Sequence, residues 1–139
     1  MSLLPSLLIA GSAAIIFVLG AIHLWYTFVG NKLHPRDPEV RARMEQTPLV
    51  LTRQTNVWKA WVGFNASHSY GALLFGAVYG YLALRHGAFL FESWFLQALG
   101  LVALLAYAVL AKRYWFSVPF RGIVLATALY VPALIIAGA

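Results

Sequence analysis

The sequence predicts an all-α integral membrane protein, a four-helix bundle with a short amphipathic cytoplasmic helix between its first two spans. Three observations predict this fold. The 139 residues are 62% hydrophobic and 10% charged, whereas soluble domains carry about 25% charged residues. Four apolar stretches reach the roughly 20 residues that cross a bilayer core. Nine of the fourteen charged side chains fall within residues 31–59. We therefore expect a single transmembrane domain over residues 1–139.

The first predicted span covers residues 7–29, which contain no charged side chain. Its length is sufficient to cross a bilayer core. The preceding residues lack the basic region that opens a signal peptide, and the apolar run is too long for a signal-peptide core. We therefore expect this segment to be retained as a membrane span.

The loop at residues 30–57 contains the predicted short helix, over residues 38–46. Asp37 is suited to the N-cap position, and Pro38 to the first helical position, where its missing N–H has no intrahelical partner to lose. Glu39 places a negative charge in the first turn, which the helix dipole favours. Pro48 is expected to end the helix, because proline restricts the residue before it and disrupts helical bonding.

Three further spans follow the loop. Residues 58–84 form the second, and Arg85, His86 and Gly87 form the turn after it. Residues 89–111 form the third span, and residues 119–138 the fourth. Pro132 is expected to kink the last span or loosen its final turns.

The distribution of basic residues predicts the orientation in the membrane. Loops one and three, together with the adjoining ends of the spans at Lys59 and Arg121, contain nine of the ten Lys and Arg residues, and loop two contains Arg85 alone. The positive-inside rule places loops one and three in the cytoplasm and both termini in the periplasm. Aromatic residues are expected at both interfaces. On the basic side these are Trp25, Trp58, Trp61, Tyr114 and Trp115, and on the other side Tyr79, Tyr81 and Trp94.

Composition excludes several classes of function. The net charge of +6 is better explained by anionic lipid headgroups than by nucleic acid, because no base-reading motif accompanies it. The absence of cysteine excludes disulfides and thiolate chemistry. No acidic residue lies in the interior of a span, which excludes a carboxylate-bridged dimetal site.

Small residues mark the faces on which the second span is expected to pack. Close approach of helices in a membrane depends on such residues. One face carries Gly63, Ser67 and Gly71, and a neighbouring face carries Ala72, Gly76 and Gly80. We expect contacts with the first span, which carries Gly20 and Ala21 and is followed by Gly30, and with the fourth span or a second copy of the chain. A homo-oligomer is therefore an expected partnership.

Polar side chains are predicted at one depth in the cytoplasmic half of the bundle. His23 lies roughly 9 Å inside the end of the first span, and His68 roughly 10–15 Å inside the start of the second, at 1.5 Å per residue. The two imidazoles can therefore face each other, with Asn65 beside them. Four more polar residues reach the same level: Thr27, Ser69, Tyr107 and Thr127. Polar groups inside a membrane indicate a functional site.

We expect this site to bind a hydrophobic or amphipathic ligand, such as a lipid or a quinone-like molecule. Arg53, Lys59 and Arg121 are expected to contact an anionic headgroup. One alternative is a haem or metal site with His23 and His68 as its ligands. Another is that the polar groups only hydrogen-bond between helices, which stabilises such contacts by about 0.6 kcal/mol each. No catalytic residue is assigned.

The layout resembles the membrane-associated eicosanoid and glutathione metabolism family of four-span trimers. The similar stretches are Asp37-Pro38-Glu39-Val40-Arg41, Arg53 with Asn56, and Pro119-Phe120-Arg121-Gly122. This resemblance implies a glutathione-transferase-like enzyme that binds glutathione through Arg53, Asn56 and Arg121. The family's glutamate in the second span and arginine in the third have no counterpart. Residues 52–71 also resemble small four-span bacterial membrane proteins of unassigned function, which implies a bacterial inner membrane.

Overall fold

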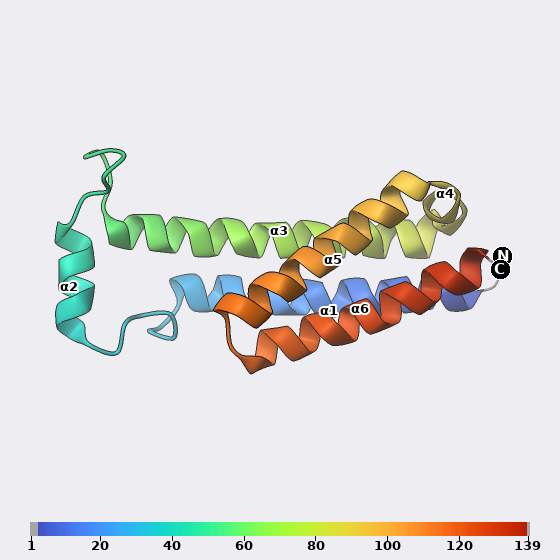
Figure 1. The fold of residues 1–139 in the computed structure, drawn as a ribbon, viewed down its shortest axis with the longest axis horizontal. Coiled ribbons are helices and arrows are strands. Elements are labelled where there is room, and N and C mark those ends of the chain that lie inside the picture. The colour runs from blue at the N-terminus through green and yellow to red at the C-terminus, as the bar shows by residue number, and fades with distance from the viewer. Residues whose placement is uncertain (1–2, 139) are drawn as a thin grey trace. The chain divides into compact units, whose positions relative to one another are not determined.

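The computed structural model describes residues 3–138, and every regular element in that range is a helix (Figure 1). The short helix α2 lies in the connection between two long helices, α1 and α3. Helices α4, α5 and α6 complete the chain. The bounds are α1 Leu3–Phe28, α2 Pro38–Gln46, α3 Val57–Arg85, α4 Gly87–Glu92, α5 Trp94–Tyr114 and α6 Ser117–Gly138.

The chain divides into two compact units. The first unit comprises residues 3–19 and 72–138, and therefore contains the beginning of α1, the end of α3, and α4 to α6. The second unit is Gly20–Gly71, with the end of α1, the connecting segment and the beginning of α3. Both boundaries between the units fall inside continuous helices.

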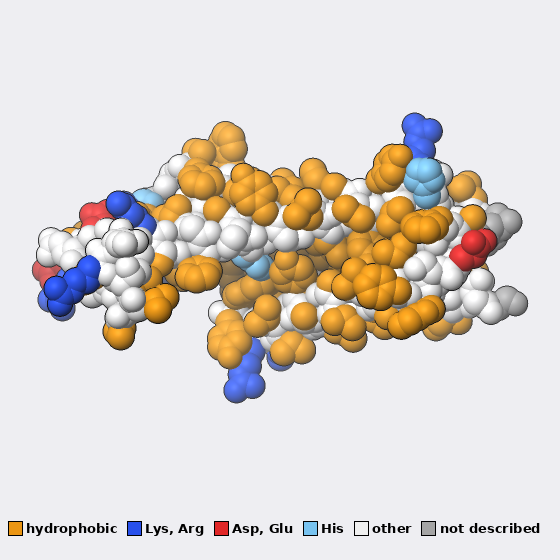
Figure 2. Space-filling model, turned by 90° about the horizontal axis from the view of Figure 1, so that it is seen from above, with side chains coloured by type: hydrophobic (Ala, Val, Ile, Leu, Met, Phe, Trp, Pro, Cys, Tyr) orange, Lys and Arg blue, Asp and Glu red, His pale blue; other side chains and the backbone are white. Residues whose placement is uncertain are grey.

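Three helices are long and apolar enough to cross a membrane: α1, α5 and α6. The mean hydropathy of their most apolar stretches is 2.4, 2.0 and 1.9, and only 28%, 17% and 22% of each stretch is buried. Figure 2 shows one face on which hydrophobic side chains cover most of the helical surface. Such a surface is suited to lipid rather than water.

Helix α3 has the length of a span but not the hydropathy, although the sequence predicted a span there. Its first half carries Asn65, Ser67, His68 and Ser69, which lower its mean hydropathy. The described residues therefore establish an all-α chain with three membrane-compatible helices.

The predicted short helix is confirmed over Pro38–Gln46. The Asp37 carboxylate accepts a hydrogen bond from the Glu39 N–H at 2.8 Å, as expected of an N-cap residue. At the other end, the Thr47 N–H and hydroxyl both donate to the Arg43 carbonyl, at 2.9 and 2.7 Å. The helix ends before Pro48, as predicted.

The third predicted span was wrong at its beginning. Residues 89–111 were expected to form one helix, but α4 ends at Glu92 and a new helix starts at Trp94. The Ser93 hydroxyl caps this second helix by accepting a bond from the Leu96 N–H at 3.4 Å. The polar pair of Glu92 and Ser93 supports a helix terminus, so the apolar helix shifts to 94–114.

Two buried tyrosines organise the first unit. The Tyr79 hydroxyl donates to the Leu96 carbonyl at 2.7 Å, and the Tyr130 hydroxyl donates to the Gln97 carbonyl at 3.1 Å. Their ring centroids lie 6.0 Å apart. The sequence placed Tyr79 in an interfacial aromatic belt, but its side chain is only 5% exposed. That expectation was wrong, because the hydroxyl finds its partner on α5 rather than at a headgroup.

Helices α1 and α3 approach closely in the first unit, at Gly76. A Cβ atom added there would lie 2.5 Å from the Phe17 Cβ and 2.7 Å from the Ala13 carbonyl oxygen. Gly80 continues the same contact, 3.7 Å from the Ala13 Cβ. The predicted small-residue face therefore packs on α1, but against Ala13 and Phe17 rather than the small residues further along that helix.

We predict that Gly76→Ala destabilises the protein by about 1–3 kcal/mol, because the added methyl group meets backbone that cannot yield. The loss of stability should appear even though alanine favours a helix over glycine by up to about 1 kcal/mol. Thermal unfolding in detergent, followed by circular dichroism, measures the effect. Gly80→Ala is the matched control on the same helix, since its added Cβ would lie 3.7 Å from the Ala13 Cβ, an ordinary contact distance. Equal stability of the two variants would contradict the prediction.

Candidate ligand-binding site

The second unit brings His23, Asn65 and His68 together. The His23 Nε2 lies 2.9 Å from the Asn65 Oδ1. The His23 and His68 rings meet edge to face, with centroids 5.2 Å apart and planes at 84°. The end of α1 supplies one histidine and the first half of α3 supplies the other two residues. The imidazoles therefore lie side by side, as their depths in the sequence predicted.

The hydrogen bonds of Asn65 determine which ring nitrogen of His23 carries the proton. The Asn65 Nδ2 donates to the Trp61 carbonyl at 2.8 Å, so its Oδ1 faces His23. An amide oxygen only accepts hydrogen bonds, and the His23 Nε2 must therefore donate. In a neutral imidazole the Nδ1 atom is then an acceptor. The side-chain amide thus selects one tautomer of His23.

The neighbouring hydroxyls bond to the carbonyls of their own helices. Thr27 donates to the His23 carbonyl at 2.8 Å, and Ser69 donates to the Asn65 carbonyl at 2.9 Å. Both bonds span four residues, which is a common way for a helix to satisfy a hydroxyl. Each hydroxyl oxygen keeps lone pairs but has committed its proton. Ser69 is completely buried, whereas Thr27 is half-buried.

Three of the predicted site residues belong to the other unit: Tyr107 on α5, and Arg121 and Thr127 on α6. The Thr127 hydroxyl donates to the Ile123 carbonyl at 2.8 Å, and Arg121 is exposed. The cluster in the second unit therefore contains five of the predicted residues: His23, Thr27, Asn65, His68 and Ser69.

The histidine cluster offers polar atoms at a partly exposed surface. His23, Asn65 and His68 are all half-buried. The His23 and His68 rings contact each other, so a planar haem could lie between them only if the two rings separated. Among residues 3–138, no group of three or more His, Cys, Asp and Glu side chains is placed to hold a metal ion. The arrangement is best suited to hydrogen bonding with a polar group.

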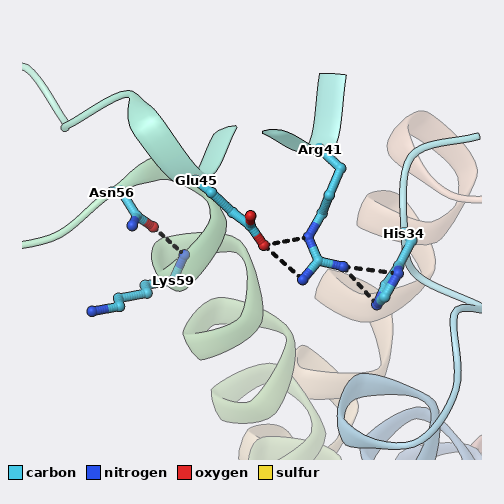
Figure 3. A network of polar contacts seen from close by, with 5 residues as sticks. All are labelled: His34, Arg41, Glu45, Asn56 and Lys59. Carbon is cyan, nitrogen blue, oxygen red and sulfur yellow. Dashed lines mark hydrogen bonds and ion pairs between the residues drawn. The ribbon is translucent and has the colours of Figure 1, made fainter. Parts of the chain in front are cut away.

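Arg41 connects α2 to the beginning of α3. Its guanidinium lies 3.7 Å above the centre of the Trp58 ring. Its Nε and Nη2 each donate to Glu45 at 2.8 Å, and its Nη1 lies 2.9 Å from the Nδ1 of His34 (Figure 3). The His34 ring also meets the Trp58 ring edge to face, with centroids 5.0 Å apart. Arg41 thereby joins α2 to the start of α3 and to the segment that follows α1.

The predicted headgroup residues of this unit lie near that junction. Arg53 and Lys59 are exposed. Asn56 caps α3, since its Oδ1 accepts a bond from the Lys59 N–H at 2.9 Å (Figure 3). A cavity of about 480 Å³ opens beside Arg41, lined by Asn31, His34, Pro35, Arg36, Pro38 and Arg41.

Sequence reasoning missed the cluster of His34, Arg41 and Trp58, and with it the role of Arg36 at the cavity. One part of it was detectable, because Arg41 and Glu45 have the four-residue spacing of a helical ion pair. The contact of Arg41 with Trp58 joins α2 to α3 across an irregular loop, and no periodicity in the sequence indicates it. The bond from the Trp61 Nε1 to the Leu33 carbonyl, at 3.0 Å, was missed for the same reason.

Comparisons with protein-family models, curated proteins and solved structures found no match for this chain. The resemblance to the membrane-associated eicosanoid and glutathione metabolism family therefore stays an expectation from the sequence. The same holds for glutathione binding by Arg53, Asn56 and Arg121.

We predict that Arg41→Lys weakens the attachment of α2 to α3 by about 1–2 kcal/mol, because lysine keeps the charge but loses the planar donor set that stacks on Trp58. Hydrogen exchange of the α2 amides should become faster. Arg43→Lys is the control, since the Arg43 side chain is 79% exposed and its pair with Glu39 is 3.8 Å long. Unchanged exchange in Arg41→Lys would contradict the role assigned to this residue.

Proposed function

We propose that this is a small integral membrane protein that binds a hydrophobic or amphipathic ligand, lipid or quinone-like, through His23, Asn65 and His68. The single observation that carries the proposal is that these three side chains form a contiguous polar cluster that is only half-buried. The helices that carry them are otherwise rich in apolar residues.

Partial exposure of this cluster distinguishes binding from a purely structural role. A polar group that faces lipid loses its hydration without replacement, and the resulting cost makes such groups rare unless they meet a partner or a cavity. Side chains that served only to join α1 to α3 would be expected to bury their polar atoms between the helices. A ligand that covers the exposed atoms removes this cost.

The hydrogen bonds within the cluster favour particular ligand groups. His23 commits its Nε2 proton to Asn65, which leaves the Nδ1 acceptor for a hydroxyl or amine donor. His68 adds a second imidazole, whose ring centre lies 5.2 Å from that of His23, and an imidazole can donate or accept hydrogen bonds. Such a site can bind a quinol hydroxyl, a quinone carbonyl or the polar part of a lipid. In this proposal Thr27 and Ser69 line the site, and Arg53 and Lys59 attract an anionic headgroup.

The proposal includes α3 as a fourth span in a bacterial inner membrane, with both termini in the periplasm and loops one and three in the cytoplasm. The basic residues of those loops support this orientation. A ligand bound to His68 and Asn65 would also offset the polarity of the first half of α3. Gly63, Ser67 and Gly71 form an exposed small-residue face of that helix, on which we propose that a second copy packs.

We predict that wild-type protein in lipid nanodiscs binds a short-chain benzoquinone in a saturable manner, detected by quenching of tryptophan fluorescence. Asn65→Leu should weaken binding about tenfold, because loss of one hydrogen-bond partner costs about 1–1.5 kcal/mol. Organic extraction and mass spectrometry of the purified protein test for a retained lipid or quinone in parallel, and the variant should retain less.

Ser67→Ala is the matched control for this experiment. Ser67 lies on the same helix, but it is exposed and donates its proton to the Phe64 carbonyl at 3.0 Å. Its removal should leave both binding and retention unchanged. Non-saturable quenching together with no retained molecule would overturn the proposed function, as would equal behaviour of Asn65→Leu and the wild type.

The proposed orientation makes a separate prediction for the chain ends. A fluorescent protein that matures only in the cytoplasm should remain dark when fused after Ala139, whereas alkaline phosphatase, which is active only in the periplasm, should be active there. Truncation fusions after Gln46 should show the opposite pattern, since the positive-inside rule places that loop in the cytoplasm. Cytoplasmic fluorescence from the full-length fusion would refute four spans in this orientation.

A further inference from the structure

The loop between α2 and α3 is closed at its base. The Val57 N–H donates to the Thr47 carbonyl at 2.9 Å, and Pro48 and Asn56 form an antiparallel bridge. Inside the loop, the Thr52 N–H donates to the Leu49 carbonyl at 3.3 Å, and the Gln54 N–H donates to the Thr52 hydroxyl at 3.1 Å. Residues 47–57 therefore form a compact loop with its two ends held together, which projects beside the start of α3 (Figure 1).

The tip of this loop carries two aliphatic side chains that nothing in the described chain covers. Val50 is 109% exposed and Leu51 is 91% exposed, more than any other large hydrophobic residue among those described. Most other exposed hydrophobic residues of this protein lie on helices, many of them on α1, α5 and α6, which are apolar enough to contact lipid. These two lie at the end of a closed turn outside any helix. Insertion into an apolar phase would remove both side chains from water, which favours burial of apolar surface.

The loop is attached to α3 at the level where α1 ends. The Trp61 Nε1 donates to the Leu33 carbonyl at 3.0 Å, which ties the second turn of α3 to the chain five residues after Phe28, the last residue of α1. Because α1 is apolar enough to cross a membrane, its end marks the approximate membrane boundary. Trp58 and Trp61 lie at this level, and tryptophan is enriched at membrane interfaces. The loop therefore begins at the expected membrane surface.

The charge around the tip has one sign. Arg53 lies two residues after Leu51, Lys59 follows in the first turn of α3, and both are exposed. The chain contains no acidic residue from position 46 to position 91. Of the three acids that precede the loop, Glu45 is paired with Arg41 and Glu39 with Arg43, and Asp37 caps α2. The basic side chains beside the tip are thus left to attract an external anion.

We propose that this loop is a membrane-surface anchor, in which Val50 and Leu51 insert into the interfacial layer of the bilayer while Arg53 and Lys59 contact anionic phospholipid headgroups. An apolar tip flanked by bases combines the two attractions that hold a surface element on an anionic membrane. Lipid suits the site better than a second copy, because the loop leaves α3 at the membrane boundary and carries charge complementary to the lipid surface. The anchor shares Arg53 and Lys59 with the headgroup contact of the proposed function, but it does not involve His23 or Asn65.

The test uses the full chain, which contains no cysteine, so one introduced thiol gives a single labelling site. V50C carrying an environment-sensitive fluorophore is reconstituted in vesicles of phosphatidylcholine and phosphatidylglycerol, three to one, with and without lipids spin-labelled near the headgroup. A42C is the matched control, because Ala42 is exposed on α2 away from the tip. The V50C emission should shift to shorter wavelength and lose intensity to the spin-labelled lipid. The A42C label should do neither.

A second arm tests the basic side chains. R53E in the V50C background should reduce quenching by the spin-labelled lipid in vesicles that contain phosphatidylglycerol, and high salt should reduce it as well. A V50C label that stays accessible to aqueous iodide and unaffected by spin-labelled lipid would overturn the proposal. So would a label shielded from iodide without lipid quenching, since that result indicates cover by a second protein chain. Equal quenching of V50C with and without R53E would overturn the role given to the bases.

Discussion

One constraint shapes the protein: polar groups within apolar helices need hydrogen-bond partners, and among the described side chains that are buried only the Ser12 hydroxyl lacks one. The hydroxyls of Thr27, Ser69 and Thr127 donate hydrogen bonds to carbonyls of their own helices. The hydroxyls of Tyr79 and Tyr130 donate instead to carbonyls of another helix, at the start of α5. The Asn65 side chain makes both kinds of hydrogen bond, one to the Trp61 carbonyl of its own helix and one to His23 on α1. The candidate site therefore lies where a polar side chain bonds beyond its own helix.

Helix α3 shows how this constraint separates packing from chemistry. After Gly71 the helix places small residues against α1 and buries Phe75 and Tyr79 in the first unit. Before Gly71 it carries the polar residues, and its partners are His23 and the connecting segment. A glycine at 76 permits close contact of backbones, whereas an asparagine at 65 requires a specific partner. The two halves of one continuous helix thus serve different purposes.

Features encoded by neighbouring residues were predictable from the sequence. Asp37, Pro38 and Glu39 predicted both the start and the capping of α2, because a helix terminus is determined locally. The approach of His23 to His68 followed from their similar predicted depths on consecutive spans. The break at Ser93 was not predicted, because a short apolar helix and the start of a long one have the same composition. The contacts of Arg41 with His34 and Trp58 depend on an irregular connection, whose path no sequence pattern determines.

The position of the boundary between the two units has a consequence for how this chain can be divided. Both boundaries lie inside helices, between residues 19 and 20 in α1 and between residues 71 and 72 in α3. Cutting the backbone at either point would leave the amides and carbonyls of one helical turn without their hydrogen-bond partners. Neither unit can therefore be exchanged between proteins as an independent module. Insertions and fusions that preserve the protein belong in the connecting segment or at the chain ends.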